Sequence, residues 1–401
     1  MRIGLFGMYG LYNYGCEAIV RGTYELAKNA WPECQIIFYT YRVDEDVKIL
    51  KDLDIIVKPV PIRKNLVIWR AINKLLRLLS LEKQFNHWDS KQVIEECDLV
   101  ISVGGDIYTI PKYILDRGSE KKYSPIVEFG KDVVKKIPMI IWGASIGPFG
   151  ETKKIKDYYF SHLKDIKQIF CREEISYNYL ISNGIDKNIQ LCSDPAFYIK
   201  NDSNPRKLEK DKIKIALNIS PLSIKEQVGE NYESFEKEII DVLIDLLSVE
   251  NSEITLVPHV ISPISVDDND LEYMKHIYSN IPKGYENRIK ILEDAEGFLG
   301  TKSFLKNCNL VIAARMHCGV NAVCEGVPTI FLTYSQKSLG MAKHIYGDTY
   351  WSIPLLDIKK ELKNKTIEIL NKHDEISAFI TNRVNEIKNE ESRIINLFKE
   401  Q

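Results

Sequence analysis

The feature that most constrains the fold is an alternation that runs along most of the chain. Short runs rich in β-branched and aromatic residues are separated by longer amphipathic segments. This order is typical of α/β proteins, in which helices connect the strands of a parallel sheet. The candidate strands are RIGLFG, CQIIFYT, DIIVKPV, LVISVGG, PMIIWGAS, QIFCR and IQLCS in the first half, then IKIALNIS, EITLVPH, RIKIL, LVIAA and TIFLTY.

A break in this alternation predicts the domain organisation. The stretch KNDSNPRKLEKDK, residues 200–212, is polar and charged and contains a proline, and a new strand follows it. We therefore expect one Rossmann-like domain over residues 1–200 and a second over 201–352, facing each other across a cleft. Residues 353–401 carry apolar side chains at helical spacing and are expected to form helices that pack across both domains.

Composition and charge limit the classes of partner. The formal net charge of -2 gives no overall attraction for nucleic acid, so an anion site has to be built locally. Eight cysteines include no C-x-x-C pair and no cysteine–histidine spacing of the zinc type, which favours reduced thiols. The N-terminus lacks the apolar core of a signal peptide, and no segment approaches the roughly 20 apolar residues of a membrane span. We expect a cytoplasmic protein, whose oligomeric state the sequence does not indicate.

One segment departs from the alternation. Residues 65–88, NLVIWRAINKLLRLLSLEKQFNHW, combine a broad apolar face with Arg70, Lys74, Arg77 and Lys83. Two interpretations are open for this amphipathic basic helix. It covers the cleft or the domain core, or it lies on the inner membrane surface or on a partner, because basic residues beside Leu and Trp suit lipid headgroups.

The candidate chemistry of the second half follows from the position of strand ends. Ligands of open parallel sheets bind outside the carboxyl ends of the strands. Arg315 and His317 follow one predicted strand, and Lys337 follows the next, so their side chains can converge on an anion. The helix that starts nearby directs free N–H groups, including that of Gly319, to the same place. His317 stands in the first helical turn, where the dipole disfavours the imidazolium and leaves the ring available for proton transfer. Taken singly, each of these residues is also explained by packing.

Two loops of the first half are candidates for binding the hydroxyl groups of a ligand. In GMYGLYNYGCEAIVRGT, Asn13 lies in the loop and Glu17 in the first helical turn, where Glu17 either complements the helix dipole or binds a sugar hydroxyl. In ISVGGDIYT, Gly104 and Gly105 end a strand and Asp106 follows. A carboxylate there can bind hydroxyls or accept a proton, or it simply caps a turn.

Arg172 is a further candidate for an anion site. It follows a strand and precedes a helix, which is the arrangement that holds a phosphate or a carboxylate, although a surface ion pair with a neighbouring glutamate is the simpler explanation. Weaker candidates at strand ends are Ser145, Asp194 and His259.

Read together, these motifs resemble one family. NYGCEAI, VGGD, WGASIGPF, CREEIS, SDPAF, PH and ARMHCGVNAVCEGVPTIFLTYSQKSLG are similar, in this order over roughly residues 3–350, to the polysaccharide pyruvyl transferases. The resemblance implies a fold like the two-domain B-type glycosyltransferases. It also implies an enzyme that moves the enolpyruvyl carbons of phosphoenolpyruvate onto two hydroxyls of a carrier-linked sugar as a ketal, for a cell-envelope or extracellular polysaccharide, with no metal and no cofactor.

The resemblance assigns roles by position. It implies that Arg172 and Arg315 bind the phosphate and carboxylate of phosphoenolpyruvate, that His317 is the general acid and that Lys337 assists with the anion. Cys16 departs from the pattern, because many relatives have an aspartate after the N-x-G step, and this bears on the acceptor contacts near Asn13.

Two other functions remain open at this point. A B-type glycosyltransferase of the same architecture would use the Arg/Lys pair to hold the diphosphate of a nucleotide sugar. It would need a carboxylate for the ribose, for which Glu325 is the available candidate. From a different class, the chain could be a non-catalytic glycan-binding or scaffold protein of an envelope assembly system.

Overall fold

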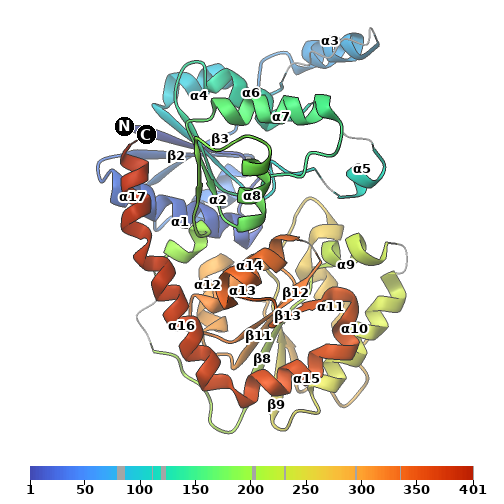
Figure 1. Ribbon diagram of the computed structural model, residues 1–401. Helices are drawn as coiled ribbons and strands as arrows, with labels where there is room; N and C mark the ends of the chain where they lie inside the picture. Colours follow the sequence, from blue (N-terminus) through green and yellow to red (C-terminus); the bar gives the residue numbers. More distant parts are fainter. Residues whose placement is uncertain are drawn as a thin grey trace. The chain divides into compact units, whose positions relative to one another are not determined.

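The computed structural model describes residues 1–78, 86–110, 112–118, 123–200, 205–229, 232–293, 296–334 and 336–400, without the side chains of 70, 77, 78, 112, 113, 336 and 337. The chain divides into two compact units (Figure 1). The N-terminal unit contains Met1–Leu11, Thr23–Pro195 and Ser392–Gln401, and the C-terminal unit contains Tyr12–Gly22 and Ala196–Glu391.

The unit boundaries differ from the predicted ones in two places. The main break falls between Pro195 and Ala196, close to the predicted residue 200. The segment Tyr12–Gly22, expected in the first domain, belongs to the C-terminal unit, because its backbone pairs with that unit. The C-terminal residues are divided as well, since Ser392–Gln401 belong to the N-terminal unit.

The N-terminal unit is built on a parallel sheet of seven strands in the order β3-β2-β1-β4-β5-β6-β7. The alternation of residues on β5 and β6 gives the sheet two apolar faces. Ile141 and Ile169 belong to the core cluster that also contains side chains of α6 and α7. Its strands are β1 (Arg2–Phe6), β2 (Gln35–Thr40), β3 (Ile55–Pro59), β4 (Leu99–Val103), β5 (Met139–Ala144), β6 (Gln168–Cys171) and β7 (Ile189–Leu191), and its helices are α2 (Val43–Ile49), α3 (Leu66–Leu78), α4 (Ser90–Glu96), α5 (Lys112–Asp116), α6 (Pro125–Val133), α7 (Lys153–Asp165), α8 (Glu174–Ser182) and α17 (Glu391–Lys399).

The other face of this sheet receives the C-terminal helix. Phe398 of α17 stacks on Phe170 with ring centroids 5.3 Å apart and meets the edge of Trp142 at 5.0 Å. All three side chains are buried. The last ten residues of the chain thus complete the core of the unit in which the chain begins.

The C-terminal unit has a parallel sheet of six strands in the order β10-β9-β8-β11-β12-β13. On β11, Ile312 joins the larger core cluster, whereas Val311 and Ala313 join a smaller one on the opposite face. The strands are β8 (Ile213–Asn218), β9 (Ser252–Leu256), β10 (Ile289–Ile291), β11 (Leu310–Ala313), β12 (Thr329–Thr333) and β13 (Ser352–Pro354), and the helices are α9 (Pro221–Val228), α10 (Tyr232–Leu246), α11 (Asp270–Ser279), α12 (Gly297–Leu305), α13 (Met316–Val323), α14 (Gln336–Tyr346), α15 (Ile358–Asn371) and α16 (His373–Asn389). Helix α1 (Tyr14–Ala30) begins in this unit and ends in the other.

The predicted amphipathic segment is helical only in part. Helix α3 covers Leu66–Leu78, and residues 79–85 lie outside the described residues. Trp88 is not part of a helix, because its indole is buried against Phe6 and Phe129 in the core of the N-terminal unit. Among the described residues, no helix has the length and the apolar composition to cross a bilayer.

Candidate active site

Three polar residues meet at the carboxyl edge of the C-terminal sheet. Asn218 ends β8, His259 follows β9 and Arg315 follows β11, and these strands are neighbours in the order β9-β8-β11. The sequence predicted this edge as the place of the chemistry, because parallel strands bring their carboxyl ends together. The backbone N–H of Arg315 donates to Oδ1 of Asn218 at 2.7 Å, which fixes the start of α13 to the end of β8.

Arg315 is held by two carboxylates that sequence reasoning missed. Its Nε and Nη2 donate to Oδ1 of Asp270 at 3.2 and 2.8 Å, and Nη2 also donates to Asp268 at 2.6 Å. Burial alone would lower the pKa of the guanidinium, but the charge and hydrogen bonds of Asp270, together with Asp268, raise it above its ordinary value. Two carboxylates thus face one guanidinium. They hold Arg315 in a fixed orientation, and an anionic ligand would have to compete with them for its charge.

Asp270 organises the whole edge. It lies at the start of α11, is fully buried, and its Oδ2 accepts from the backbone N–H groups of His259 and Val260 at 3.0 and 3.1 Å. The same oxygen accepts from Nδ2 of Asn218 at 3.3 Å. A buried carboxylate needs such partners, and here they tie the ends of three strands to the guanidinium of Arg315. The acidic run DDND, residues 267–270, is the sequence signal for this hub.

His317 lies in the first turn of α13, and the start of α1 packs against its ring. A Cβ atom built on Gly15 would lie 2.5 Å from Nδ1 of His317, so only glycine leaves room for the imidazole here. The side chain of Asn13 accepts from the N–H of Gly15 at 2.9 Å. The N–H of Tyr14 donates to the carbonyl of His259 at 3.0 Å, which holds the loop in place. Asn13, expected in the domain over residues 1–200, is therefore a neighbour of His317 within the C-terminal unit.

His259 is the second imidazole of this edge. Its ring is buried and meets Tyr14 and Phe298 edge-on, with ring centroids 5.5 and 6.0 Å apart. Burial, followed by the charges of His317 and Arg315, lowers the pKa of His259 well below its ordinary value. Within the described part of the chain its Nε2 has no hydrogen-bond partner. His259 is thus a neutral ring at neutral pH, placed behind the more exposed residues of the site.

Glu17 does not have the place that the sequence predicted. Its side chain is buried, Oε1 accepts from Nε of Arg21 at 2.7 Å, and Oε2 accepts from the backbone N–H of Phe298 at 2.7 Å. The carboxylate caps the start of α12 and pairs with a cation one turn along α1. Because both oxygens are engaged below the surface, Glu17 serves the packing of the C-terminal unit and does not present a carboxylate to a sugar.

Gly319 and Lys337 are the two other residues predicted to bind the anion. The N–H of Gly319 donates to the carbonyl of Arg315 at 3.3 Å, inside α13, and a side chain at this position would collide with Phe331. Gly319 is therefore required for close packing, and its N–H is not directed at a ligand. Lys337 belongs to the first turn of α14, and its side chain lies outside the described residues.

A second polar edge lies in the N-terminal unit. Arg172, which follows β6, is only 2% exposed, and its Nη1 donates to Oδ2 of the fully buried Asp194 at 3.1 Å. Its Nε and Nη2 both donate to Oγ of Ser145, at 3.1 and 3.0 Å. Nη2 also donates to the carbonyl of Gly105 at 3.4 Å and lies 3.5 Å from Oδ1 of Asp106. The alternative explanation of Arg172 as a surface ion pair with a neighbouring glutamate does not hold, because the guanidinium is buried and points into the edge of the sheet.

The two carboxylates that Arg172 approaches differ in access. Asp194 is fully buried, and its charge offsets that of the guanidinium. The side chain of Asp106 is 60% exposed, so it can reach a ligand from solvent. Gly104 precedes it in a left-handed backbone conformation with φ of 143°, which turns the chain away from β4.

Glu325 removes the support for a ribose site. It lies before β12, at the amino edge of the sheet, whereas ligands bind at the carboxyl edge. Its side chain is 4% exposed and faces the ammonium groups of Lys302 and Lys306 at 3.2 and 3.4 Å. These contacts make Glu325 a buried structural carboxylate.

Solved structures of sugar-nucleotide enzymes share this fold. The chain aligns over 100% of its length, and of the other chain, with Anabaena Alr3699/HepE in complex with UDP and glucose, with a TM-score of 0.60 and 14% identity. It aligns with the S. aureus MnaA–UDP structure at a TM-score of 0.59 and 13% identity, covering 99% of this chain and 95% of that one. A UDP-N-acetylglucosamine 2-epimerase from Listeria monocytogenes gives 0.54 and 16%, with 95% and 90% covered. At such low identity the likeness shows the fold alone, which confirms the predicted B-type glycosyltransferase-like architecture.

The family of the chain follows from comparison of its sequence with family models. No curated protein matches the chain. A family model described as polysaccharide pyruvyl transferase matches residues 13–336, a range that contains Asn13, Arg172, Arg315 and His317. Membership implies an enzyme whose acceptor is a sugar or polysaccharide. This chain, with its two parallel α/β units and its Arg-x-His step at a strand end, belongs to the polysaccharide pyruvyl transferase family.

Proposed function

We propose that the chain transfers the enolpyruvyl group of phosphoenolpyruvate to two hydroxyls of one sugar in a carrier-linked polysaccharide precursor, with a pyruvate ketal as product. The observation that carries this proposal is the pair of Arg315 and His317 at the carboxyl edge of the C-terminal sheet. A cation and an imidazole stand there two residues apart in a member of a pyruvyl transferase family. An enol phosphate such as phosphoenolpyruvate needs both groups, a cation to bind its negative charge and an acid to protonate its methylene carbon.

The reaction needs one proton at the methylene carbon of the donor. Protonated His317 delivers it, and the central carbon becomes electrophilic. One sugar hydroxyl adds to that carbon and returns a proton to the imidazole. The bond from the central carbon to the phosphate oxygen breaks, the second hydroxyl closes the ketal, and its proton leaves with the phosphate. The sum is one ketal and one hydrogen phosphate from one donor and one diol.

The donor would bind at Arg315 by exchange of one carboxylate for another. Phosphoenolpyruvate carries close to three negative charges at neutral pH, so it competes with the side chain of Asp268, which is 31% exposed. Asp270 is fully buried and would keep the guanidinium oriented during this exchange. The family resemblance adds Arg172 and Lys337 as further cations for the donor. On the acceptor side, the exposed carboxylate of Asp106 and the amide of Asn13 are the groups we assign to sugar hydroxyls.

The decisive experiment offers phosphoenolpyruvate together with carrier-linked sugars and follows phosphate release and product mass. Pyruvyl transfer requires that phosphate release depend on both substrates and that the sugar gain a ketal-linked pyruvate. Consumption of a UDP-sugar, with no use of phosphoenolpyruvate, would instead show a glycosyltransferase. Binding of glycan without turnover of either donor would show a non-catalytic protein. An acceptor carried by a membrane lipid would require the enzyme to work at a bilayer surface.

A further inference from the structure

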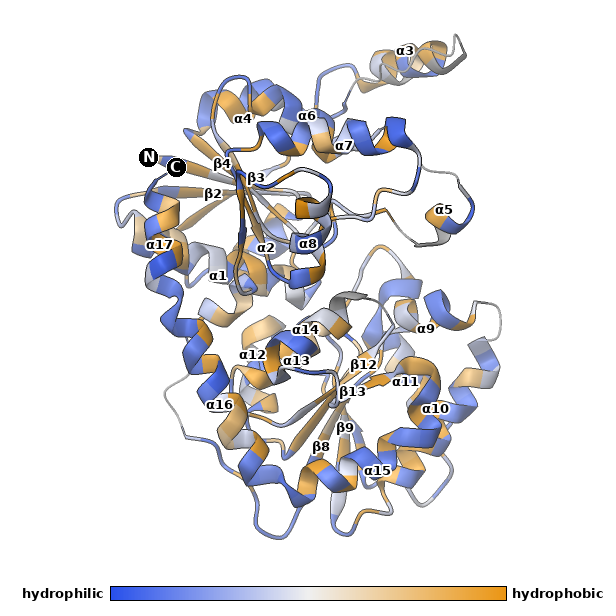
Figure 2. Cartoon of the chain, in the orientation of Figure 1, coloured by the Kyte–Doolittle hydropathy of each residue, from blue (hydrophilic) through white to orange (hydrophobic). Residues whose placement is uncertain are grey.

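Helix α3 (Leu66–Leu78) exposes apolar side chains that a soluble helix normally buries. Val67 is 79% exposed, Leu75 56% and Ile68 55%. Figure 1 shows that α3 stands away from the sheet of the N-terminal unit, and Figure 2 shows its hydrophobic residues along the helix. The sequence left open whether this segment covers the core. The exposure of these three side chains shows that they do not.

The two faces of α3 differ in chemistry. Ile68, Ile72 and Leu75 recur at the spacing of one helical face. Arg70, Lys74 and Arg77 recur at the same spacing two positions later, which places them about 200° around the helix axis and on the opposite face. Residues 55–81 contain no aspartate or glutamate. A helix with one apolar face, one basic face and no acidic residue has the composition of helices that lie in a membrane interface.

The base of α3 is fixed to the folded unit. Arg63, just before the helix, donates to the carbonyl of Trp88 at 3.1 Å and lies 3.6 Å from a carboxylate oxygen of Asp132 on α6. Its guanidinium also lies over the ring of Trp69, 5.6 Å from the centroid. The helix is thus a fixed projection of the N-terminal unit, which presents its apolar face without unfolding.

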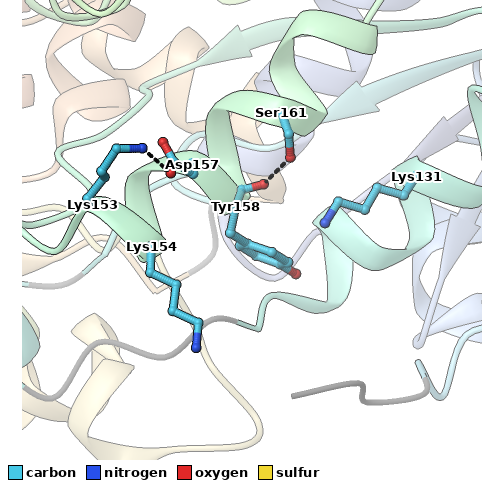
Figure 3. A pocket seen from close by; sticks show the side chains of 6 residues that line it. All are labelled: Lys131, Lys153, Lys154, Asp157, Tyr158 and Ser161. Atoms are coloured by element: carbon cyan, nitrogen blue, oxygen red, sulfur yellow. Dashed lines mark hydrogen bonds and ion pairs between the residues drawn. The ribbon is translucent and has the colours of Figure 1, made fainter. Parts of the chain in front are cut away.

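Further cationic groups lie on the two helices beside this anchor. A cavity of about 510 Å3 between α6 and α7 is lined by three lysines and one aspartate, with Tyr158 and Ser161 (Figure 3). Lys131, next to Asp132 on α6, lies over the ring of Tyr158 at 3.9 Å from the centroid. The three lysines are Lys131, Lys153 and Lys154, of which Lys153 pairs with Asp157 at 2.6 Å and Lys131 with Glu128 at 3.6 Å, so the cavity adds little net positive charge to that of α3.

We propose that α3 docks the N-terminal unit on an anionic lipid bilayer, with Ile68, Ile72 and Leu75 in the boundary between headgroups and acyl chains. The charge of the helix decides between occupants. A second copy of this chain, with a formal net charge of -2, offers no strong negative surface to Arg70, Lys74 and Arg77, whereas anionic headgroups do. The inference goes beyond pyruvyl transfer and stands without it, because vesicle binding is measured in the absence of both substrates.

The test is sedimentation of the full chain with vesicles of phosphatidylcholine alone or of phosphatidylcholine mixed with phosphatidylserine. The wild type is expected to pellet with the mixed vesicles, and less at high salt or with phosphatidylcholine alone. Changing Ile68, Ile72 and Leu75 together to serine should weaken pelleting at least about tenfold, because the buried apolar area is lost.

A matched variant controls for the loss of surface apolar groups. Val47, Ile175 and Ile181 are 47%, 42% and 39% exposed in the same unit, and their change to serine should leave pelleting unchanged. Circular dichroism checks that both triple variants are folded. Lys74→Glu should weaken binding to the mixed vesicles further than binding to phosphatidylcholine.

Three outcomes would overturn the proposal. Equal pelleting of the wild type and the α3 variant would show that another surface binds lipid. Absence of pelleting with either vesicle would show that none does. A dimer that dissociates on changing Ile68, Ile72 and Leu75, seen by sedimentation velocity, would show that a second copy covers the apolar face. None of these results depends on whether phosphoenolpyruvate is the donor.

Discussion

The positive charge of Arg315 is already paired with two carboxylates in the absence of a ligand. Its guanidinium contacts Asp268 and Asp270, and Asp270 in turn holds the backbone of His259. Removal of Arg315 would leave the fully buried carboxylate of Asp270 without its cationic partner, which lowers the free energy of unfolding by roughly 3–5 kcal/mol. An alanine at this position therefore mixes a loss of donor binding with a loss of stability, and the neighbouring residues give cleaner tests.

Asp268→Asn should strengthen the binding of phosphoenolpyruvate by about threefold to tenfold, because a partly exposed carboxylate that competes for Arg315 is neutralised. Isothermal calorimetry measures the affinity directly. Asp267→Asn is the matched control, since Asp267 pairs with Lys225 at 2.7 Å and not with Arg315. Weaker donor binding by the Asp268 variant would show that this carboxylate orients Arg315 and does not compete with the donor.

His317→Gln should lower turnover by roughly 100-fold to 10,000-fold and leave donor affinity nearly unchanged. Glutamine keeps one hydrogen bond and similar shape but cannot deliver a proton, whereas Arg315 still holds the anion. Phosphate release gives the turnover and calorimetry gives the affinity. Turnover close to that of the wild type in a folded variant would make His317 structural and turn attention to Asp106 and His259 as the acid.

At the scale of elements, the helix pair α6 and α7 contains a buried histidine without polar partners. Both ring nitrogens of His162 lack a hydrogen-bond partner within the described residues, and the ring stacks on Tyr108 with centroids 6.1 Å apart. Burial, with a smaller effect from the charge of Lys131, lowers the pKa of His162 to about 3. The folded unit therefore keeps this ring neutral over most of the acidic range.

This neutral histidine makes stability depend on pH. The unfolded chain takes up a proton near pH 6.5 and the folded unit only near pH 3, so stability falls as the pH is lowered between these values, by at most about 1.4 kcal/mol per pH unit. His162→Leu should remove that part of the slope. Urea unfolding of both proteins at several pH values between 6.5 and 4.5 measures it. Parallel slopes for the two proteins would show that His162 is protonated or solvated in the folded state.

The elements themselves were largely predictable, and their long-range contacts were not. Every predicted strand is present, because buried parallel strands are apolar runs with clear ends. The short β13, Ser352–Pro354, was missed, since three residues that end in proline give no such run. The sequence placed Arg315 and His317 at one edge correctly. It did not predict that Asp270 binds Arg315, Asn218 and the backbone of His259, because a carboxylate's partners depend on strand order.

At the scale of the whole molecule, each unit contains a piece of chain from the other end of the sequence. Tyr12–Gly22 enters the C-terminal unit, where Glu17 caps α12 and Gly15 makes room for His317. Ser392–Gln401 returns to the N-terminal unit. A cut near residue 200 would therefore give two incomplete units. The local pattern of the sequence cannot show this exchange, because the segments look like ordinary parts of their neighbouring helices.

Because α17 packs into the N-terminal unit, we expect its buried side chains to contribute strongly to the stability of that unit. Phe398 is fully buried between Trp142 and Phe170, so Phe398→Ala should lower the free energy of unfolding of this unit by about 3–5 kcal/mol. Deletion of residues 392–401 should lower the free energy of unfolding by at least as much, since Ile394 is also fully buried.

The matched control is Phe379→Ala on α16, where the ring is 47% exposed and the loss of stability should be small. Urea unfolding followed by tryptophan fluorescence is suited to the measurement, because Trp142 itself contacts Phe398 and reports the first loosening of this face. If the deletion left the unfolding midpoint in place, α17 would be an accessory of the fold, and the N-terminal sheet would have to keep Trp142 and Phe170 buried by other means.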